Sequence, residues 1–114
     1  MPMDMNIWRN NIRQAVDSIA DEQYQRRAWF GGGPEESSPT EEYCMLFDNG
    51  AIEDFLCRND AGLNQYQIDS GKHLVELMNQ LSKTVPKHIN PSDLIDDPRW
   101  VKIRQAAKDF LAML

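Results

Sequence analysis

The chain has 114 residues, of which 41% are hydrophobic and 26% charged, and its formal net charge is −6. This length and composition are typical of one folded domain and argue against a disordered chain or direct nucleic-acid binding. There is no apolar run near the ~20 residues of a membrane-spanning helix, and the first residues lack a secretory pattern. We therefore expect a single helical domain over residues 1–114, located in the cytoplasm.

Apolar residues at helical spacing predict an amphipathic helix from about Asp4 to Arg27. Its inward positions are Trp8, Ile12, Ala15, Val16 and Ile19. The run Gly31-Gly32-Gly33-Pro34 follows, and three glycines with a proline cannot continue a helix. The sequence therefore predicts a glycine-rich loop after the first helix.

The next segment allows two interpretations. Ser38 is a predicted N-cap with Pro39 in the first helical position. Asn49-Gly50 lies between two apolar runs, which is a strong hairpin signal and would make residues 43–56 a pair of strands. The apolar residues on both sides of Gly50, however, share helical spacing: Tyr43, Leu46 and Phe47 before it, then Ile52, Phe55 and Leu56 after it. We favour two short helices joined at Gly50 and keep the hairpin as the alternative.

The second half of the chain predicts a long helix over residues 61–84, which Pro86 ends. Its predicted inward residues are Leu63, Tyr66, Leu74, Leu77, Met78, Leu81 and Val85. Gly71 in the middle allows close packing or a bend. A short turn starts at Asn90, and a last helix starts at Pro98 after an Asp97 cap. Since no segment alternates with period two, the predicted fold class is all-α, a compact bundle of about five helices.

No motif for catalysis or metal binding stands out. The two histidines, His73 and His88, belong to no ligand pattern, and no nucleophile motif surrounds Cys44. Cys44 and Cys57 are the only cysteines, and we expect both to be reduced and mostly buried. We expect no cofactor, no metal and no enzymatic activity; a Cys44–His73 pair is the residual catalytic alternative.

The negative charge is concentrated in one stretch, residues 34–60, which we call the acidic segment. It carries eight carboxylates and one cation, Arg58, and so has a charge of −7, whereas the rest of the chain sums to +1. A neutral protein with one acidic region has a field that can steer a basic partner toward that region.

Aromatic residues accompany these acids. Phe47 and Phe55 are expected in the core, whereas Trp29 and Phe30, beside the glycine loop, are the better candidates for exposure and for interface anchoring. The predicted partner-binding residues are Trp29, Phe30, Glu35, Glu36, Glu41, Glu42, Asp48, Glu53 and Asp54.

One stretch of the chain, about residues 28–57, carries a series of short motifs: Trp29-Phe30-Gly31, Gly33-Pro34-Glu35, Ser37-Ser38-Pro39, Glu42-Tyr43, Leu46-Phe47-Asp48 and Glu53-Asp54-Phe55-Leu56. With these motifs the stretch resembles a group of small bacterial immunity proteins from contact-dependent growth inhibition and related polymorphic-toxin systems. It departs from their pattern at Asn49-Gly50.

This resemblance implies a non-catalytic cytoplasmic protein that binds and neutralises the toxic C-terminal domain of a cognate effector, commonly a nuclease. The acidic segment agrees with it, because a nuclease groove is basic. A small helical adaptor or regulator that binds another basic cytoplasmic protein is the alternative function.

Overall fold

The computed structural model describes residues 4–30, 36–85 and 89–114. Within these ranges the chain forms seven α-helices, one π-helical segment (η1) and one 3₁₀ turn (η2), and no strand. Their bounds are α1 Met5–Ala20, α2 Glu22–Ala28, α3 Pro39–Tyr43, η1 Cys44–Asn49, α4 Ile52–Cys57, η2 Asn59–Ala61, α5 Gln65–Thr84, α6 Pro91–Leu94 and α7 Pro98–Met113. The all-α prediction is confirmed, although these ranges hold seven α-helices rather than about five, and the hairpin alternative for residues 43–56 is wrong.

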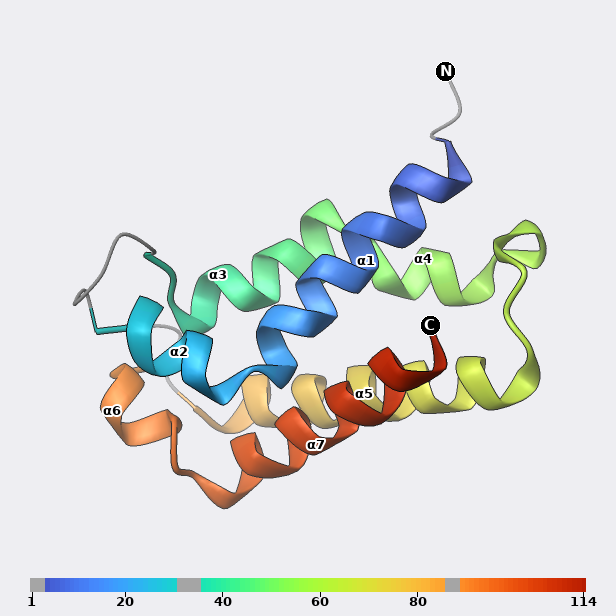
Figure 1. The fold of residues 1–114 in the computed structure, drawn as a ribbon. Coiled ribbons are helices and arrows are strands. Elements are labelled where there is room, and N and C mark those ends of the chain that lie inside the picture. Colours follow the sequence, from blue (N-terminus) through green and yellow to red (C-terminus); the bar gives the residue numbers. More distant parts are fainter. Residues whose placement is uncertain (1–3, 31–35, 86–88) are drawn as a thin grey trace.

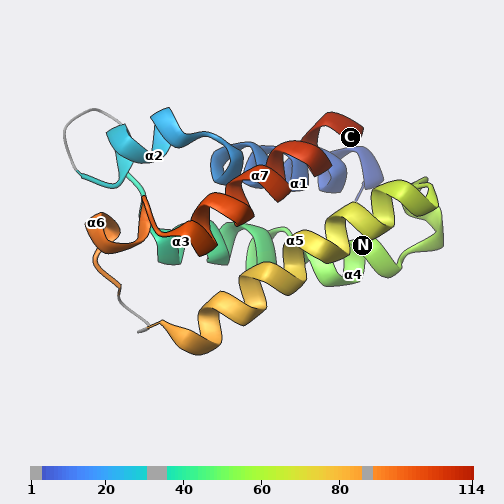
Figure 2. The same ribbon diagram turned by 90° about the horizontal axis from the view of Figure 1, so that it is seen from below.

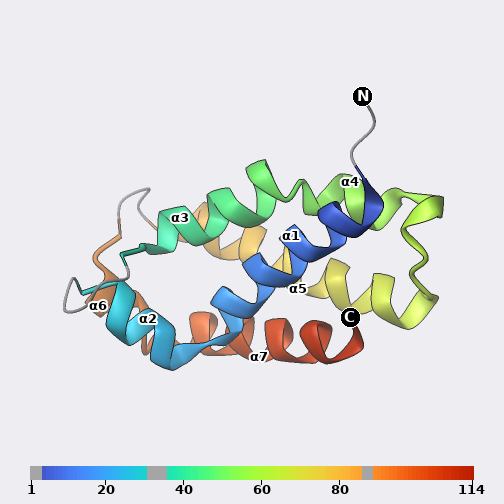
Figure 3. The same ribbon diagram turned by 45° about the horizontal axis from the view of Figure 1, so that its top comes forward.

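The helices pack in a simple order. Helix α7 packs against both α1 and α5, which makes it the centre of the long helices (Figure 1). Helix α3, segment η1 and helix α4 follow one another in a row; α1 contacts η1, and α5 contacts α4 (Figure 3). Seen from below, α5 and α7 lie side by side (Figure 2). The row α3–η1–α4 is therefore an outer layer on the long helices.

The core forms where the apolar stripes of these helices meet. The largest apolar side chains with almost no exposed surface are Ile12, Ile19, Leu46, Ile52, Phe55, Leu74, Met78, Leu94, Trp100, Ile103 and Phe110. A Cβ atom at Gly71 would lie 2.6 Å from a Leu56 methyl carbon, so the glycine serves close packing and α5 runs through it unbroken. Tyr66, predicted to face inward, is 79% exposed, because the first turn of α5 extends beyond the core.

Most helices begin at a side-chain cap. Six N-cap side chains accept a hydrogen bond from a backbone N–H two or three residues later: Asp4, Asp21, Ser38, Asn64, Asn90 and Asp97. The predicted caps at Ser38 and Asp97 are thus confirmed. The Asn64 cap starts α5 at Gln65, four residues after the predicted start. Each cap satisfies a backbone donor that the first helical turn leaves free.

The predicted helix from Asp4 to Arg27 is divided at Asp21. This residue has extended dihedral angles, φ −99° and ψ 96°, and its carboxylate accepts from Tyr24 N at 3.0 Å. The carbonyls of Ser18 and Ile19, in the last turn of α1, accept instead from Gln25 Nε2 at 3.0 and 2.8 Å. One carboxylate and one amide therefore replace the backbone hydrogen bonds that a continuous helix would make.

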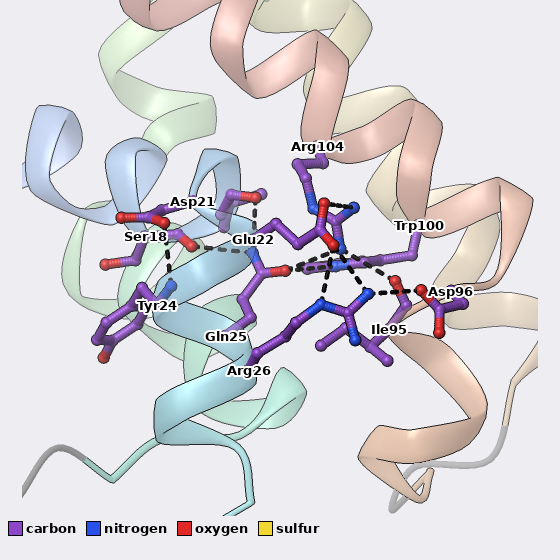
Figure 4. A network of polar contacts seen from close by, with 11 residues as sticks. Ser18, Asp21, Glu22, Tyr24, Gln25, Arg26, Ile95, Asp96, Trp100 and Arg104 are labelled. Carbon is purple, nitrogen blue, oxygen red and sulfur yellow. Dashed lines mark hydrogen bonds and ion pairs between the residues drawn. The ribbon is translucent and has the colours of Figure 1, made fainter. Parts of the chain in front are cut away.

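The Gln25 side chain is the centre of a buried polar network (Figure 4). Its Oε1 accepts from Trp100 Nε1 at 3.0 Å and from an Arg104 nitrogen at 3.2 Å, and the residue has no exposed surface. Both amide hydrogens and both oxygen lone pairs are thus used, which is the full capacity of a glutamine amide. The network joins the end of α1 and helix α2 to α7.

Arg104 extends this network to the surface. Its guanidinium donates to Ile95 O at 3.0 Å and lies 3.3 Å from Glu22 Oε1. Burial lowers the pKa of Arg104, whereas the Glu22 carboxylate favours the charged form. Hydrogen bonding from Arg26, followed by the charge of Arg104, lowers the pKa of Glu22. The buried cation is therefore held by an amide, a carbonyl and a carboxylate.

We expect Gln25→Leu to destabilise the fold by about 3 kcal/mol or more, because it leaves the Trp100 N–H and part of the Arg104 guanidinium buried without acceptors. Urea unfolding followed by circular dichroism measures this change. Gln105→Leu is the matched control, since Gln105 is exposed on α7, and it should change stability by less than about 0.5 kcal/mol. Equal effects of the two substitutions would contradict a structural role for the network.

Candidate interaction surface

The acidic segment forms most of the outer row α3–η1–α4. Six of its carboxylates are exposed. Asp60 pairs with Arg58, and we call the other five the acidic surface: Glu36, Glu41, Asp48, Glu53 and Asp54. Glu35, also predicted to contact a partner, lies outside the described residues. The structure explains part of this grouping, since the carboxylates of Glu41 and Asp48 both act on the thiol of Cys44 at the junction of α3 and η1.

The prediction that Trp29 is exposed is wrong. The residue caps the end of α2, retains 6% exposure, and its ring centroid lies 5.4 Å from that of Trp100. The structure brings it into the core because α2 is held against α7 by Gln25. Phe30, the next residue, is 49% exposed and agrees with the prediction. Phe30 therefore stays a candidate contact residue, whereas Trp29 does not.

Glu42 does not belong to the acidic surface either, because its side chain has no exposed area. It lies three residues after the buried Pro39 and four before the buried Leu46, and so occupies the inward face of this segment. The Ser37 hydroxyl donates to Glu42 Oε1 at 2.8 Å. Burial raises the pKa of Glu42 to about 7; Ser37 and the nearby Trp29 indole oppose the shift, and the like charge of Glu41 adds to it.

Cys44 lies between two acids of the surface, and its exposure contradicts the prediction of buried cysteines; Cys57 is also exposed. Desolvation, then the neighbouring Asp48 and Glu41 carboxylates, raise the pKa of the Cys44 thiol. The influence of both acids shows that Glu41, Cys44 and Asp48 lie close together. The shift keeps the thiol protonated, which is the opposite of an activated nucleophile.

The acids differ in how far nearby cations balance them. Glu53 lines a groove between α4 and α5 together with Lys72 and Lys83. Elsewhere in the segment, Arg58 pairs with Asp60 at 2.7 Å.

In the part of the chain that the structure describes, no ion pair joins Glu41, Asp48 or Asp54 to a cation. Glu36 likewise pairs with none of the described cations. These four carboxylates therefore carry uncompensated negative charge, and two of them, Glu41 and Asp48, lie on α3 and η1.

The backbone beneath this charge is unusual. Segment η1 is a π-helix, and Ala51 after it has left-handed dihedral angles, φ 47° and ψ 50°. Helix α4 is the one α-helix of the described chain without a side-chain cap. The Trp8 indole donates to Gly50 O at 2.6 Å and fixes this junction from α1. Such segments are frequent at functional sites.

An apolar groove lies along another side of α3, between this helix, the end of α5 and α6. It measures about 440 Å³ and is lined by Pro39, Thr40, Tyr43, Leu81, Ser82, Val85, Ile89 and Leu94. The Tyr43 hydroxyl donates to Met78 O at 2.8 Å, and the ring stacks on Phe47. Helix α3 therefore carries the exposed carboxylate of Glu41 and also borders an apolar groove.

Over the described ranges, no group of three or more histidine, cysteine, aspartate or glutamate residues is placed to hold a metal ion. Across the same ranges, no helix has the length and apolarity to cross a membrane. Comparisons with models of protein families, with curated proteins and with solved structures found no match to this chain.

We expect Ala51→Gly to stabilise the protein by about 0.5–1 kcal/mol, because glycine adopts left-handed dihedral angles without the strain of a Cβ atom. Gly50→Ala should have the opposite effect and cost about 1–3 kcal/mol, since its Cβ would lie 2.8 Å from Leu46 O. Thermal and urea unfolding of both variants measure these changes. A loss of stability in Ala51→Gly would show that the left-handed residue carries no strain.

Proposed function

We propose that this chain is an immunity protein that binds and neutralises the toxic C-terminal domain, most simply a nuclease domain, of a cognate effector. The uncompensated charge of Glu41 and Asp48 on α3 and η1 is the observation that carries the proposal. The resemblance of residues 28–57 to immunity proteins supports it from the sequence. The acidic surface is the proposed docking site.

The physical argument begins with the partner. A nuclease holds a polyanion, so its substrate groove is lined with cations that release counterions when phosphate binds. Carboxylates without internal partners can meet these cations and raise the association rate by long-range attraction. Glu41 and Asp48 meet this requirement better than Glu53, which shares the lining of a groove with Lys72 and Lys83.

Exposed charges alone would let the bound partner dissociate quickly. Desolvated apolar contacts must therefore set the dissociation rate of the complex. Three exposed features near the carboxylates offer such contacts. Met45, 37% exposed, lies between Glu41 and Asp48 in the chain, and Phe30, 49% exposed, follows the end of α2. The groove beside α3 is lined mostly by apolar side chains. We propose that the partner places apolar residues among its cations.

Co-expression with the toxin domain encoded next to this gene tests the function directly. The proposal expects restored growth, one-to-one co-purification and loss of toxic activity in the purified complex. Absence of rescue together with absence of binding would overturn it. A neighbouring gene that encodes no toxin, with a basic cytoplasmic protein captured instead, would favour the adaptor alternative.

In the complex, we expect the double substitution Glu41→Lys with Asp48→Lys to slow association tenfold or more, because it reverses the uncompensated charge. Stopped-flow association at several salt concentrations measures the rate. The variant should also lose most of the salt dependence that the wild-type rate shows.

The matched control reverses two carboxylates of α5 and α7, Asp69→Lys with Asp109→Lys. Both are exposed and bond to a glutamine of their own helix. This pair changes the net charge by the same amount, so it should slow association much less. Equal slowing by the two pairs would mean that net charge acts and that α3 and η1 form no docking site.

A further inference from the structure

The buried carboxylate of Glu42 is the strongest feature that the proposed binding function does not use. It belongs to α3 but contacts both ends of the connection from α2, through Ser37 and Trp29. Ser37 is itself fastened to the end of α2, because its N–H donates to Ala28 O at 3.0 Å. We call Trp29, Ser37 and Glu42 the latch.

The polar atoms of the latch are incompletely satisfied. Glu42 Oε2 and Trp29 Nε1 are both buried, and neither completes a hydrogen bond of good geometry. An ionised carboxylate buried with one donor and no cation is costly, whereas a neutral carboxyl group is tolerated far better. The geometry therefore favours the closed latch when Glu42 holds a proton.

The charged surroundings agree with this reading. Among the described residues, Glu41 on the same helix is the one charged group that acts on Glu42, and it has the same sign. Helix α1 and segment η1, which also pack against α3, bring no described charge to bear on it. Ionisation of Glu42 thus finds no compensating cation within the closed latch.

We propose that Glu42 is a proton-controlled latch, which fastens the end of α2 to α3 when protonated and releases Ser37 and Trp29 when it ionises. Release moves the carboxylate into water and opens the contact beside Phe30 and Glu41, at one end of the acidic surface. This inference rests on the latch geometry and does not depend on the proposed toxin partner.

The sign of the pH effect follows from linkage. The pKa of Glu42 is about 7 in the closed latch and near 4.5 when the side chain is in water. Between these values the open state has lost a proton that the closed state keeps, so opening becomes easier as pH rises. The opening equilibrium should increase about tenfold per pH unit from about pH 4.5 and level off above pH 7.

Hydrogen exchange of the Ser37 amide measures this opening, because opening breaks its bond to Ala28 O. After correction for intrinsic exchange, we expect protection to fall about fortyfold from pH 5 to pH 7 in the wild type. In Glu42→Gln protection should stay constant over the same range. The variant changes no other side chain, so the contributions of the rest of the protein cancel in the comparison.

Amides in the middle of α5 report global unfolding in the same experiment, and Ser37 should exchange faster than they do. The proposal is overturned if Ser37 exchanges only with global unfolding, or if its pH dependence survives in Glu42→Gln. Should that variant not fold, Ser37→Ala replaces it, read at the amide of residue 37. The Ser37 hydroxyl favours the charged form of Glu42, so its loss raises the pKa of Glu42. The opening equilibrium must then level off at a higher pH than in the wild type. An unchanged pH profile also overturns the proposal.

Discussion

The fold depends on the buried amide of Gln25. Its nitrogen donates to two carbonyls in the last turn of α1, and its oxygen accepts from two side chains of α7. These four hydrogen bonds allow one orientation of the side chain, which stabilises the break between α1 and α2 at Asp21. Because α2 is fixed in this way, Trp29 is placed against Trp100. The position of α3 follows in turn, since Ser37 is bonded to Ala28 O and to Glu42. One amide thus sets the geometry at the start of the outer row.

At the other end of that row, side-chain packing stabilises the strained junction between η1 and α4 at Ala51. A left-handed alanine costs about 1–2 kcal/mol, and α4 has no side-chain cap to offset it. The indole of Trp8 binds the carbonyl of Gly50, and Phe55 packs on Trp8 at 5.5 Å between ring centroids. Burial of these rings supplies more stabilisation than the junction loses. The strained backbone at Ala51 therefore persists beneath the acidic surface, because packing in the core outweighs its cost.

Local patterns in the sequence predict the helices well, but they predict the breaks and irregular turns between helices poorly. The spacing of apolar residues in α1 and α7 and the caps at Ser38 and Asp97 are readable because their causes lie within one helical turn. The break at Asp21 cannot be predicted in this way, because it depends on hydrogen bonds from Trp100 and Arg104, more than 70 residues away. Asn49-Gly50 indicates a tight turn, but the left-handed residue is Ala51, and Gly50 is required for space. The inward position of Glu42 was readable from its spacing to Leu46, and only its charge argued for the surface.

These corrections change the electrostatics more than the fold. Of the carboxylates in the acidic segment, Glu42 is buried with a pKa near neutrality, Asp60 is paired with Arg58, and Glu53 shares the lining of a groove with lysines. The remaining field comes from Glu36, Glu41, Asp48 and Asp54. The effective surface is thus smaller than the charge count suggests, and it includes Asp48 of the π-helix. In the proposed function, a surface of this kind attracts a basic partner through a few carboxylates, and we propose that the shape of η1 around Met45 then discriminates among partners.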